Sequence, residues 1–435
     1  MIQVKQIPKD YLQEKETTEN EKQWTIENVH DPAIYKDGDW YYIFSTDAQI
    51  TGQFKPGIQI RKSRDLLNWQ WVGRAFSEIP KAAKEWTGAG GLWAPEITKY
   101  GDTYYLYYSA SQFGKNQSFI GVATSKHIEG PWEDQGEVIK TKQGPGPNAI
   151  DANITFDKNG EPWMVYGSFF DGIFLKKIDA QTGKTAEPGL GKQIAKRHIS
   201  VEGAIEGPYI LYHPLHDYYY LFVSYDSLFT NYNIRVARSK KIDGPYVDVK
   251  GNEMTNTTLP PNDVGVKILG GYKFSSSYGW IGPGHNSVLQ DGEQYFIVHH
   301  ARTEKYKGHY LHIRQLIWSK DGWPLALPER YTGESERPID IEEVYGDWEY
   351  VFLDKNENHQ IHSHIFTLSK QPTHSSSVKK VESTQNHFRL TGVNNSDLEL
   401  IVIEGWDWEK WQTTLLFTGK DVTGNVFFGK KVKSE

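Results

Sequence analysis

The 435-residue chain contains no cysteine, which excludes disulfides, thiolate metal sites and a cysteine nucleophile. No apolar run approaches the roughly 20 residues that a transmembrane helix needs, so no membrane partner is expected. Residues 1–24 have neither an apolar core nor a small-residue cleavage site, and they do not resemble a signal peptide. As written, the sequence predicts a cytoplasmic protein; a trimmed N-terminus would make it extracellular.

An excess of basic residues is also missing. Lys and Arg number 48 against 55 Asp and Glu, a net charge of −7, which disfavours nucleic acid and other polyanionic partners. Strong helical periodicity is absent as well. What the chain does have is aromatic residues, 14 % of the total, and 40 glycines, a composition typical of β-strands joined by tight turns.

A β-hairpin pattern occurs five times. In each case an ionisable residue precedes a short strand, a Gly or Asp turn and a second, aromatic strand. The five ionisable residues are Asp31, Glu96, Asp151, Glu206 and His285. A third strand pattern follows each hairpin, beginning near Ile58, Phe119, Ile173, Asn233 and Leu311.

Five such units, with a weaker fourth strand after several of them, predict an all-β fold: a five-bladed β-propeller over residues 25–335, after an N-terminal extension at residues 1–24. A charged, proline-containing stretch at residues 327–341 then reads as a linker. Short alternating strands follow it and predict a small β-barrel or sandwich domain over residues 345–435. The Ser- and Lys-rich run at 372–380 is interpreted as a solvated loop.

Propeller geometry brings the starts of the five innermost strands to one end of the axis, so Asp31, Asp151 and Glu206 are expected to converge. Taken singly, an Asp-Pro or Glu-Gly-Pro is usually turn chemistry. Three carboxyl groups at equivalent places favour glycoside hydrolysis, in which one carboxyl group protonates the leaving oxygen and another activates water or attacks the anomeric carbon. Glu96 sits at a slightly different register and is assigned a structural duty.

The motifs HDP at His30, WAPE at Trp93, IDAN at Ile150, AIEGPYI at Ala204 and PGHNSV at Pro283 together resemble glycoside hydrolase family 43, most closely its endo-1,5-α-L-arabinanases. The resemblance covers roughly residues 25–330. The C-terminal stretch from Gly405 is similar to the small β-barrel appended to longer extracellular arabinanases.

The resemblance implies a five-bladed propeller and an inverting mechanism. It assigns Asp31 as general base, Asp151 as the carboxylate that orients the acid and modulates its pKa, and Glu206 as general acid. Glu202, four residues before Glu206, is the rival for the acid, but it lacks the following Gly-Pro. Similar arabinanases have Asp where this chain has Glu96, which puts only local packing in doubt.

His285 has two interpretations. A lone His on a strand is more often a hydrogen-bonded structural residue, whereas in similar arabinanases the matching histidine reaches a calcium ion held mainly by water on the propeller axis. The resemblance therefore implies one calcium ion at His285, although hard cations prefer oxygen ligands. The doublet His299 and His300 has no metal spacing and is interpreted as structural.

Sugar binding should use aromatic platforms, because the apolar face of a furanose ring buries well against them. Trp93 and Phe113 are the candidates, with a packing role between blades open for Trp93. Asn153, Ser168 and His30 are predicted to hydrogen-bond the sugar.

The expected partner is a plant cell-wall polysaccharide or arabino-oligosaccharides, bound by a monomer. Two alternatives stay open: an exo-acting α-L-arabinofuranosidase or β-xylosidase on the same scaffold, and a non-catalytic carbohydrate-binding propeller. The complete carboxylate trio favours an enzyme.

Overall fold

A computed structural model describes residues 19–50, 53–303, 308–334, 337–372, 378, 380–393 and 396–432. Most of the predicted N-terminal extension, residues 1–18, and most of the Ser- and Lys-rich run at 372–380 lie outside the described residues. The described chain starts with a short 3-10 helix, η3 (Glu21–Gln23), and then the buried Trp24.

The first two blades are four-stranded antiparallel sheets. In each, a two-residue loop with a glycine at positive φ, Gly38 or Gly101, joins the first two strands, as expected of a tight hairpin. Blade 1 comprises β1 (Ala33–Asp37), β2 (Trp40–Ser45), β5 (Gln59–Ser63) and β6 (Gln70–Arg74), with β3 (Gln49–Ile50) and β4 (Gln53–Phe54) as a small excursion. Blade 2 comprises β7 (Trp93–Tyr100), β8 (Thr103–Ala110), β9 (Phe119–Ser125) and β10 (Glu133–Lys140).

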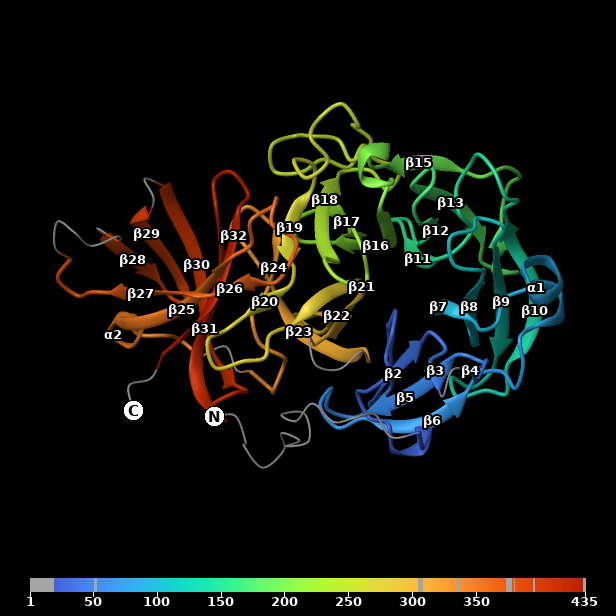
Figure 1. The fold of residues 1–435 in the computed structure, drawn as a ribbon, viewed down its shortest axis with the longest axis horizontal. Helices are drawn as coiled ribbons and strands as arrows, with labels where there is room; N and C mark the ends of the chain where they lie inside the picture. The colour runs from blue at the N-terminus through green and yellow to red at the C-terminus, as the bar shows by residue number, and fades with distance from the viewer. Residues whose placement is uncertain are drawn as a thin grey trace.

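The other three blades repeat this plan (Figure 1). Blade 3 comprises β11 (Asn153–Phe156), β12 (Pro162–Tyr166), β13 (Ile173–Asp179), β14 (Lys184–Thr185) and β15 (Lys192–Ala195). Blade 4 comprises β16 (Ile205–His213), β17 (Tyr218–Tyr225), β18 (Asn233–Ser239) and β19 (Val266–Leu269). Blade 5 comprises β21 (Ile281–Asp291), β22 (Gln294–Arg302), β23 (Tyr310–Trp318) and β24 (Pro324–Ala326). The predicted five-bladed propeller is confirmed, and the five predicted third strands coincide with β5, β9, β13, β18 and β23.

The ring is closed by the segment before blade 1. Glu27 forms an antiparallel bridge with Tyr310 of blade 5, and the N–H of Leu311 donates to the carbonyl of Ile26. Helices are few: α1 (Lys81–Thr87) before blade 2, the four-residue α2 (Ile341–Val344) and a 3-10 turn, η4 (Ile199–Val201). None of the helices in the described part of the chain has the length and apolarity that a membrane crossing requires.

After the propeller comes a domain built on one seven-stranded sheet, in the order β27-β25-β32-β31-β30-β29-β28. Side chains from five of these strands share a single core, so the sheet curves around it. The strands are β25 (Gly346–Phe352), β27 (His364–Leu368), β28 (Lys380–Thr384), β29 (His387–Val393), β30 (Ser396–Asp407), β31 (Gln412–Asp421) and β32 (Val426–Lys431).

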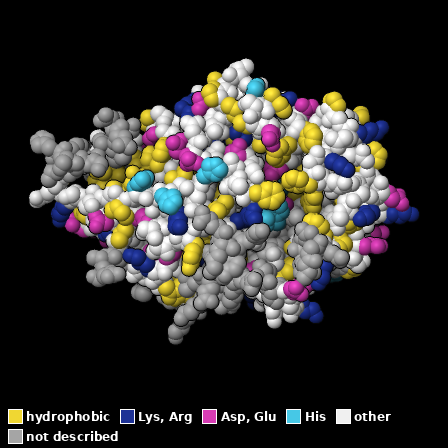
Figure 2. Space-filling model, viewed as in Figure 1, with side chains coloured by type: hydrophobic (Ala, Val, Ile, Leu, Met, Phe, Trp, Pro, Cys, Tyr) yellow, Lys and Arg dark blue, Asp and Glu magenta, His cyan; other side chains and the backbone are white. Residues whose placement is uncertain are grey.

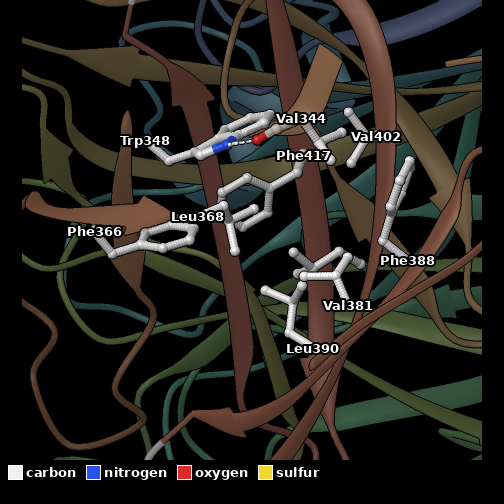
Figure 3. Close-up of a pocket in the computed structure, with 10 residues that line it drawn as sticks. Val344, Trp348, Phe366, Leu368, Val381, Phe388, Leu390, Val402 and Phe417 are labelled. Atoms are coloured by element: carbon white, nitrogen blue, oxygen red, sulfur yellow. Dashed lines mark hydrogen bonds between the residues drawn. The ribbon is translucent and has the colours of Figure 1, made fainter. Parts of the chain in front are cut away.

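Aromatic side chains fill the interior of this C-terminal domain. Trp348, Phe366, Phe388 and Phe417 point into it, and the Trp348 indole N–H donates to the Val344 carbonyl at 2.7 Å (Figure 3). The cavity left between them is only ≈ 10 Å³, about what one water molecule needs. Among the described residues, the interior around this cavity is a packed core, and the cavity has no room for a ligand larger than water.

The two domains are joined by a common core and by backbone pairing. Val351, Leu353, Val426 and Phe428 of the C-terminal domain pack with apolar residues of blades 4 and 5, and in Figure 1 the orange and red strands lie beside those blades. In addition β20 (Tyr272–Lys273), between blades 4 and 5, pairs in parallel with β26 (Ile361–His362). On the face shown in Figure 2, acidic, basic and apolar side chains are interspersed without a broad basic area.

Candidate active site

A residue with positive φ lies near the start of the innermost strand in every blade, where the blades converge. These residues are Asp31 (φ 50°), Ala94 (33°), Asp151 (62°), Gly207 (55°) and His285 (49°). Non-glycine residues rarely adopt this conformation, and where they do it often marks a functional site. In two blades the ionisable residue lies off this position: Glu96 lies two residues after Ala94, in keeping with its different register, and Glu206 lies one residue before Gly207, where an exact match was predicted.

Hydrogen bonds between neighbouring blades fix these positions. At four of the five blade junctions, a side chain at the end of the second strand of one blade accepts the backbone N–H of the positive-φ residue in the next blade; between blades 3 and 4, Asp151 accepts the Gly207 N–H instead. Thr46 Oγ1 accepts from Ala94 at 2.7 Å, Ser109 Oγ from Asp151 at 3.0 Å, Ser224 Oγ from His285 at 2.7 Å, and His300 Nδ1 from Asp31 at 3.3 Å. The last bond joins blade 5 to blade 1 and completes the ring. His300 thus ties blade 5 to blade 1 by a hydrogen bond, and its ring nitrogen also lies within 4.8 Å of ring nitrogens of His30 and His309.

Asp31 is a buried carboxylate surrounded by donors. Thr46 Oγ1 donates to its Oδ2 at 2.5 Å, His30 Nδ1 lies 3.0 Å from the same oxygen, and His285 Nδ1 lies 3.0 Å from Oδ1. Burial by itself would raise the pKa of Asp31, but the charges and hydrogen bonds of His285 and His30 outweigh it and hold the pKa well below its usual range. Asp31 is thus ionised at neutral pH.

The pKa of Asp151, in contrast, is raised above its usual range. Its burial raises its pKa to about 8; His285 opposes this rise, while the negative charges of Glu206 and Asp31 add to it. One Asp151 oxygen accepts the Gly207 N–H at 3.1 Å, directly beside Glu206. The three carboxyl groups are therefore close enough to act on one another, as the convergence of the blades predicts, and burial favours the protonated form of Asp151.

Glu206 is held at both oxygens. Ser168 Oγ donates to Oε2 at 2.8 Å, and the Tyr232 hydroxyl donates to Oε1 at 2.8 Å. A side chain at the following Gly207 would place its Cβ 3.0 Å from Cγ of His285. Glycine there leaves room for the His285 ring, while Glu206 supplies the carboxyl group from one residue earlier. The rival Glu202 lies exposed at the end of η4.

The charge of the His285 ring interacts with the charges of the neighbouring carboxyl groups. Burial would lower its pKa, but Asp31 and Asp151 raise it to about 9, so the ring carries a positive charge at neutral pH. Because Nδ1 is used by Asp31, only Nε2 remains for a ligand. One nitrogen donor fits a calcium ion only if water supplies most of the oxygen ligands that this ion prefers.

Glu96 and Asn153 form a separate buried pair in the wall between blades 2 and 3. The Asn153 amide donates to Glu96 Oε1 at 2.9 Å and its oxygen accepts the Ile210 N–H at 2.9 Å. Burial raises the pKa of Glu96 to about 8, against the hydrogen bonds of Ile154 and Asn153. With its amide group used in this way, Asn153 gains no support as a sugar contact.

The other predicted sugar contacts divide into two groups. Ser168 is buried and donates to Glu206, and His30 contacts Asp31 through Nδ1 while its Nε2 is buried. Both side chains contact carboxyl groups of this cluster in the present arrangement. Trp93 is half-buried at the start of β7, and Phe113 is 76 % exposed. These two aromatic residues remain available to a sugar.

Sequence reasoning missed Thr46, Tyr232 and Phe229. A Ser, Thr or His recurs near the end of the second strand of each blade, and this recurrence could have identified Thr46. Tyr232, in contrast, lies in a loop with no repeat, 26 residues from the Glu206 that it contacts. Phe229 is 54 % exposed, and its ring centroid lies 6.1 Å from that of Phe113, so the loops of blades 2 and 4 meet at this aromatic pair.

The family described as glycosyl hydrolases family 43 matches residues 25–324, and a C-terminal lipocalin-like domain matches residues 328–429. The chain belongs to glycosyl hydrolase family 43. It is a glycoside hydrolase, and its propeller is the matched part. The lipocalin-like match agrees with the curved sheet around one core.

Full-length relatives agree with this assignment. The chain is 32 % identical to the extracellular endo-α-(1→5)-L-arabinanase 2 of Bacillus subtilis, over 93 % of each chain. The solved structure of an endo-1,5-α-L-arabinanase from Thermotoga petrophila is similar with a TM-score of 0.84 and 30 % identity, covering 94 % of this chain and 99 % of that one. An extracellular exo-α-(1→5)-L-arabinofuranosidase of Cellvibrio japonicus is 37 % identical over 68 % of this chain and 86 % of its own length.

Proposed function

We propose that this glycoside hydrolase cleaves internal α-1,5-L-arabinofuranosidic bonds of arabinan with inversion of the anomeric centre. The observation that carries the proposal is the cluster near the blade starts: an ionised Asp31 and a Glu206 held by two hydroxyl groups, with Asp151 and His285 in electrostatic reach of both.

Each carboxyl group has one role. Asp31, ionised at neutral pH, takes a proton from a water molecule as that water attacks the anomeric carbon. Glu206 gives its proton to the glycosidic oxygen, and the bond from the anomeric carbon to this oxygen breaks. Asp151 contacts the Gly207 N–H and influences Glu206 from the neighbouring blade, which suits a group that orients and tunes the acid.

Endo action is favoured by the full-length relatives, both of which are named as endo-acting. Exo action is the second candidate, because the Cellvibrio japonicus relative with the same kind of propeller is exo-acting by name. The product profile on linear arabinan separates them: internal cleavage gives mixed oligosaccharides early, while exo cleavage gives arabinose or one short product from the start. Debranched xylan and nitrophenyl pentosides test the xylosidase alternative.

The experiment for the catalytic roles compares Glu206→Gln with Glu202→Gln. Removing a general acid typically costs about 10²-fold or more, so Glu206→Gln should lose at least about a hundredfold in rate while keeping its fold. Glu202→Gln, four residues away and exposed, should keep the wild-type rate. Full activity of Glu206→Gln, or retained configuration in the first products by NMR, would overturn the mechanism; inactivity of the wild type on every glycoside would favour the binding module.

Calcium binding is part of the proposal at His285. Nε2 of this residue would hold the ion after losing its proton, with water completing the shell, and the ion would then supply the positive charge beside Asp31 and Asp151. Since relatives are named as extracellular, we further propose that the protein works outside the cell on plant cell-wall polysaccharide or its oligosaccharides.

A further inference from the structure

A loop of the C-terminal domain covers two buried basic side chains of blade 4. Arg235 on β18 and Lys267 on β19 are almost fully buried. Lys267 Nζ donates to the carbonyls of Asp354 at 3.0 Å and Glu357 at 2.7 Å, and Arg235 Nη2 donates to the carbonyl of Lys355 at 2.7 Å. Burying a charge is costly unless it is hydrogen-bonded, and here the C-terminal domain supplies these acceptors to the propeller.

Asn358, in the same loop, reaches further into blade 4. Its side-chain oxygen accepts from Lys267 Nζ at 3.1 Å, and its amide donates to Asp226 Oδ2 at 2.8 Å. Asp226 directly follows β17, has a positive φ of 70°, and also accepts from the Asn233 amide at 3.0 Å. Within the described residues, the Asn358 amide thus connects the C-terminal domain to this carboxylate.

Hydrogen bonds connect Asp226 to the strand that carries Glu206. Arg197, with a side chain 1 % exposed, contacts Asp226 Oδ1 at 2.6 Å and donates to the Ala204 carbonyl at 2.8 Å. The backbone N–H of Asp226 donates to the same Ala204 carbonyl at 3.2 Å. Ala204 lies two residues before Glu206, so two donors that both depend on Asp226 set the position of the acid strand.

We infer that Asn358 is a positioning residue for the general acid, and that the C-terminal domain completes the active site of the propeller through Asn358, Asp226 and Arg197. The inference rests on the proposed role of Glu206 as that acid. It gives the second domain a function in catalysis, whereas the packed interior of that domain offers no ligand site.

The test uses leaving groups, because a poorly positioned acid matters only when the leaving oxygen needs a proton. The full-length protein and Asn358→Ala are compared on linear arabinan and on an α-1,5-arabinotrioside carrying 2-chloro-4-nitrophenol, which departs without protonation. We expect kcat on arabinan to fall about tenfold or more, since small displacements of a catalytic group are costly. KM should change less than about twofold, and kcat on the aryl arabinotrioside should stay within about twofold of the wild type.

Two further variants make the outcome specific. Asn358→Asp keeps an acceptor for Lys267 but loses the donor to Asp226, so it should show the same selective loss even if Asn358→Ala folds poorly. Lys420→Gln breaks another contact between the domains, that of Lys420 Nζ with Asp321 Oδ2 at 2.7 Å, and should leave both rates unchanged.

The results are decisive in either direction. Equal losses on both substrates, or an unchanged rate on arabinan in folded Asn358→Asp, would overturn the inference. If the wild type cleaved the aryl arabinotrioside and arabinan but Glu206→Gln remained as sensitive to the leaving group as the wild type, the assignment of the acid would fail instead.

Discussion

Replacing Gly207 by alanine tests whether the space beside Glu206 must belong to the His285 ring. Gly207 has a φ of +55°, and an added Cβ would lie 3.0 Å from Cγ and 3.1 Å from Nδ1 of His285. The same Nδ1 is 3.0 Å from Asp31 Oδ1. The new methyl group should therefore push His285 by a few tenths of an ångström and disturb its contact with the base.

The magnitude has two parts, which a matched control separates. A non-glycine residue in the left-handed region costs about 1–2 kcal/mol. Gly101→Ala carries the same backbone cost, since Gly101 has a φ of +57° in the hairpin turn of blade 2, but no atom lies within 4 Å of its added Cβ. Both variants should lose about 1–2 kcal/mol of stability. Because a misplacement of about 1 Å can cost about 10²-fold, we expect kcat to fall about tenfold in Gly207→Ala and less than about twofold in Gly101→Ala.

Urea unfolding gives the two stabilities, and initial rates on linear arabinan give kcat. A folded Gly207→Ala protein with the wild-type rate would refute the argument that this glycine makes room for His285. An equal loss of rate in Gly101→Ala would show that backbone strain alone, and not the contact with His285, is responsible.

Three other outcomes are expected. Burial holds the pKa of Glu96 at about 8 against an ordinary 4.5, so stability linked to its protonated form is fully present below pH 4.5 and is lost as pH rises through about 8. At about 1.36 kcal/mol per pKa unit, unfolding free energy should fall by up to about 5 kcal/mol more in the wild type than in Glu96→Gln over this window, and parallel pH profiles would contradict it. Phe113→Ala should raise KM on arabinan several-fold. The control Leu215→Ala should not, since Leu215 is 90 % exposed on the β16–β17 turn. Equal KM values for the two variants would exclude Phe113 as a sugar-binding platform. Chelation should lower activity and added calcium should restore it, while indifference to chelation would leave His285 a structural residue.

The blades could be predicted because their signals are local. Alternating aromatic strands, a turn after about six residues and a third strand recur in every unit, and each reflects short-range backbone preferences. The register of the innermost strands was harder. Aligning ionisable residues placed Glu96 and Glu206 opposite Asp31, whereas aligning the residues before Pro32, Pro95 and Pro208 pairs Asp31 with Ala94 and Gly207, as the structure does. A proline restricts the conformation of the residue before it, and an ionisable side chain does not, so proline was the better guide.

The contacts around the acid lay beyond sequence reasoning for a physical reason. Asn358 and Asp226 are 132 residues apart and in different domains. Lys267 donates to two backbone carbonyls of the loop at residues 354–358 and Arg235 donates to one, and every residue of any sequence offers such a carbonyl. A partner with no side-chain identity leaves no pattern to find. The sequence shows only that two basic residues, Arg235 and Lys267, lie in strands that become buried. Their burial predicts that hydrogen-bond acceptors must be present, but it does not predict which domain supplies them.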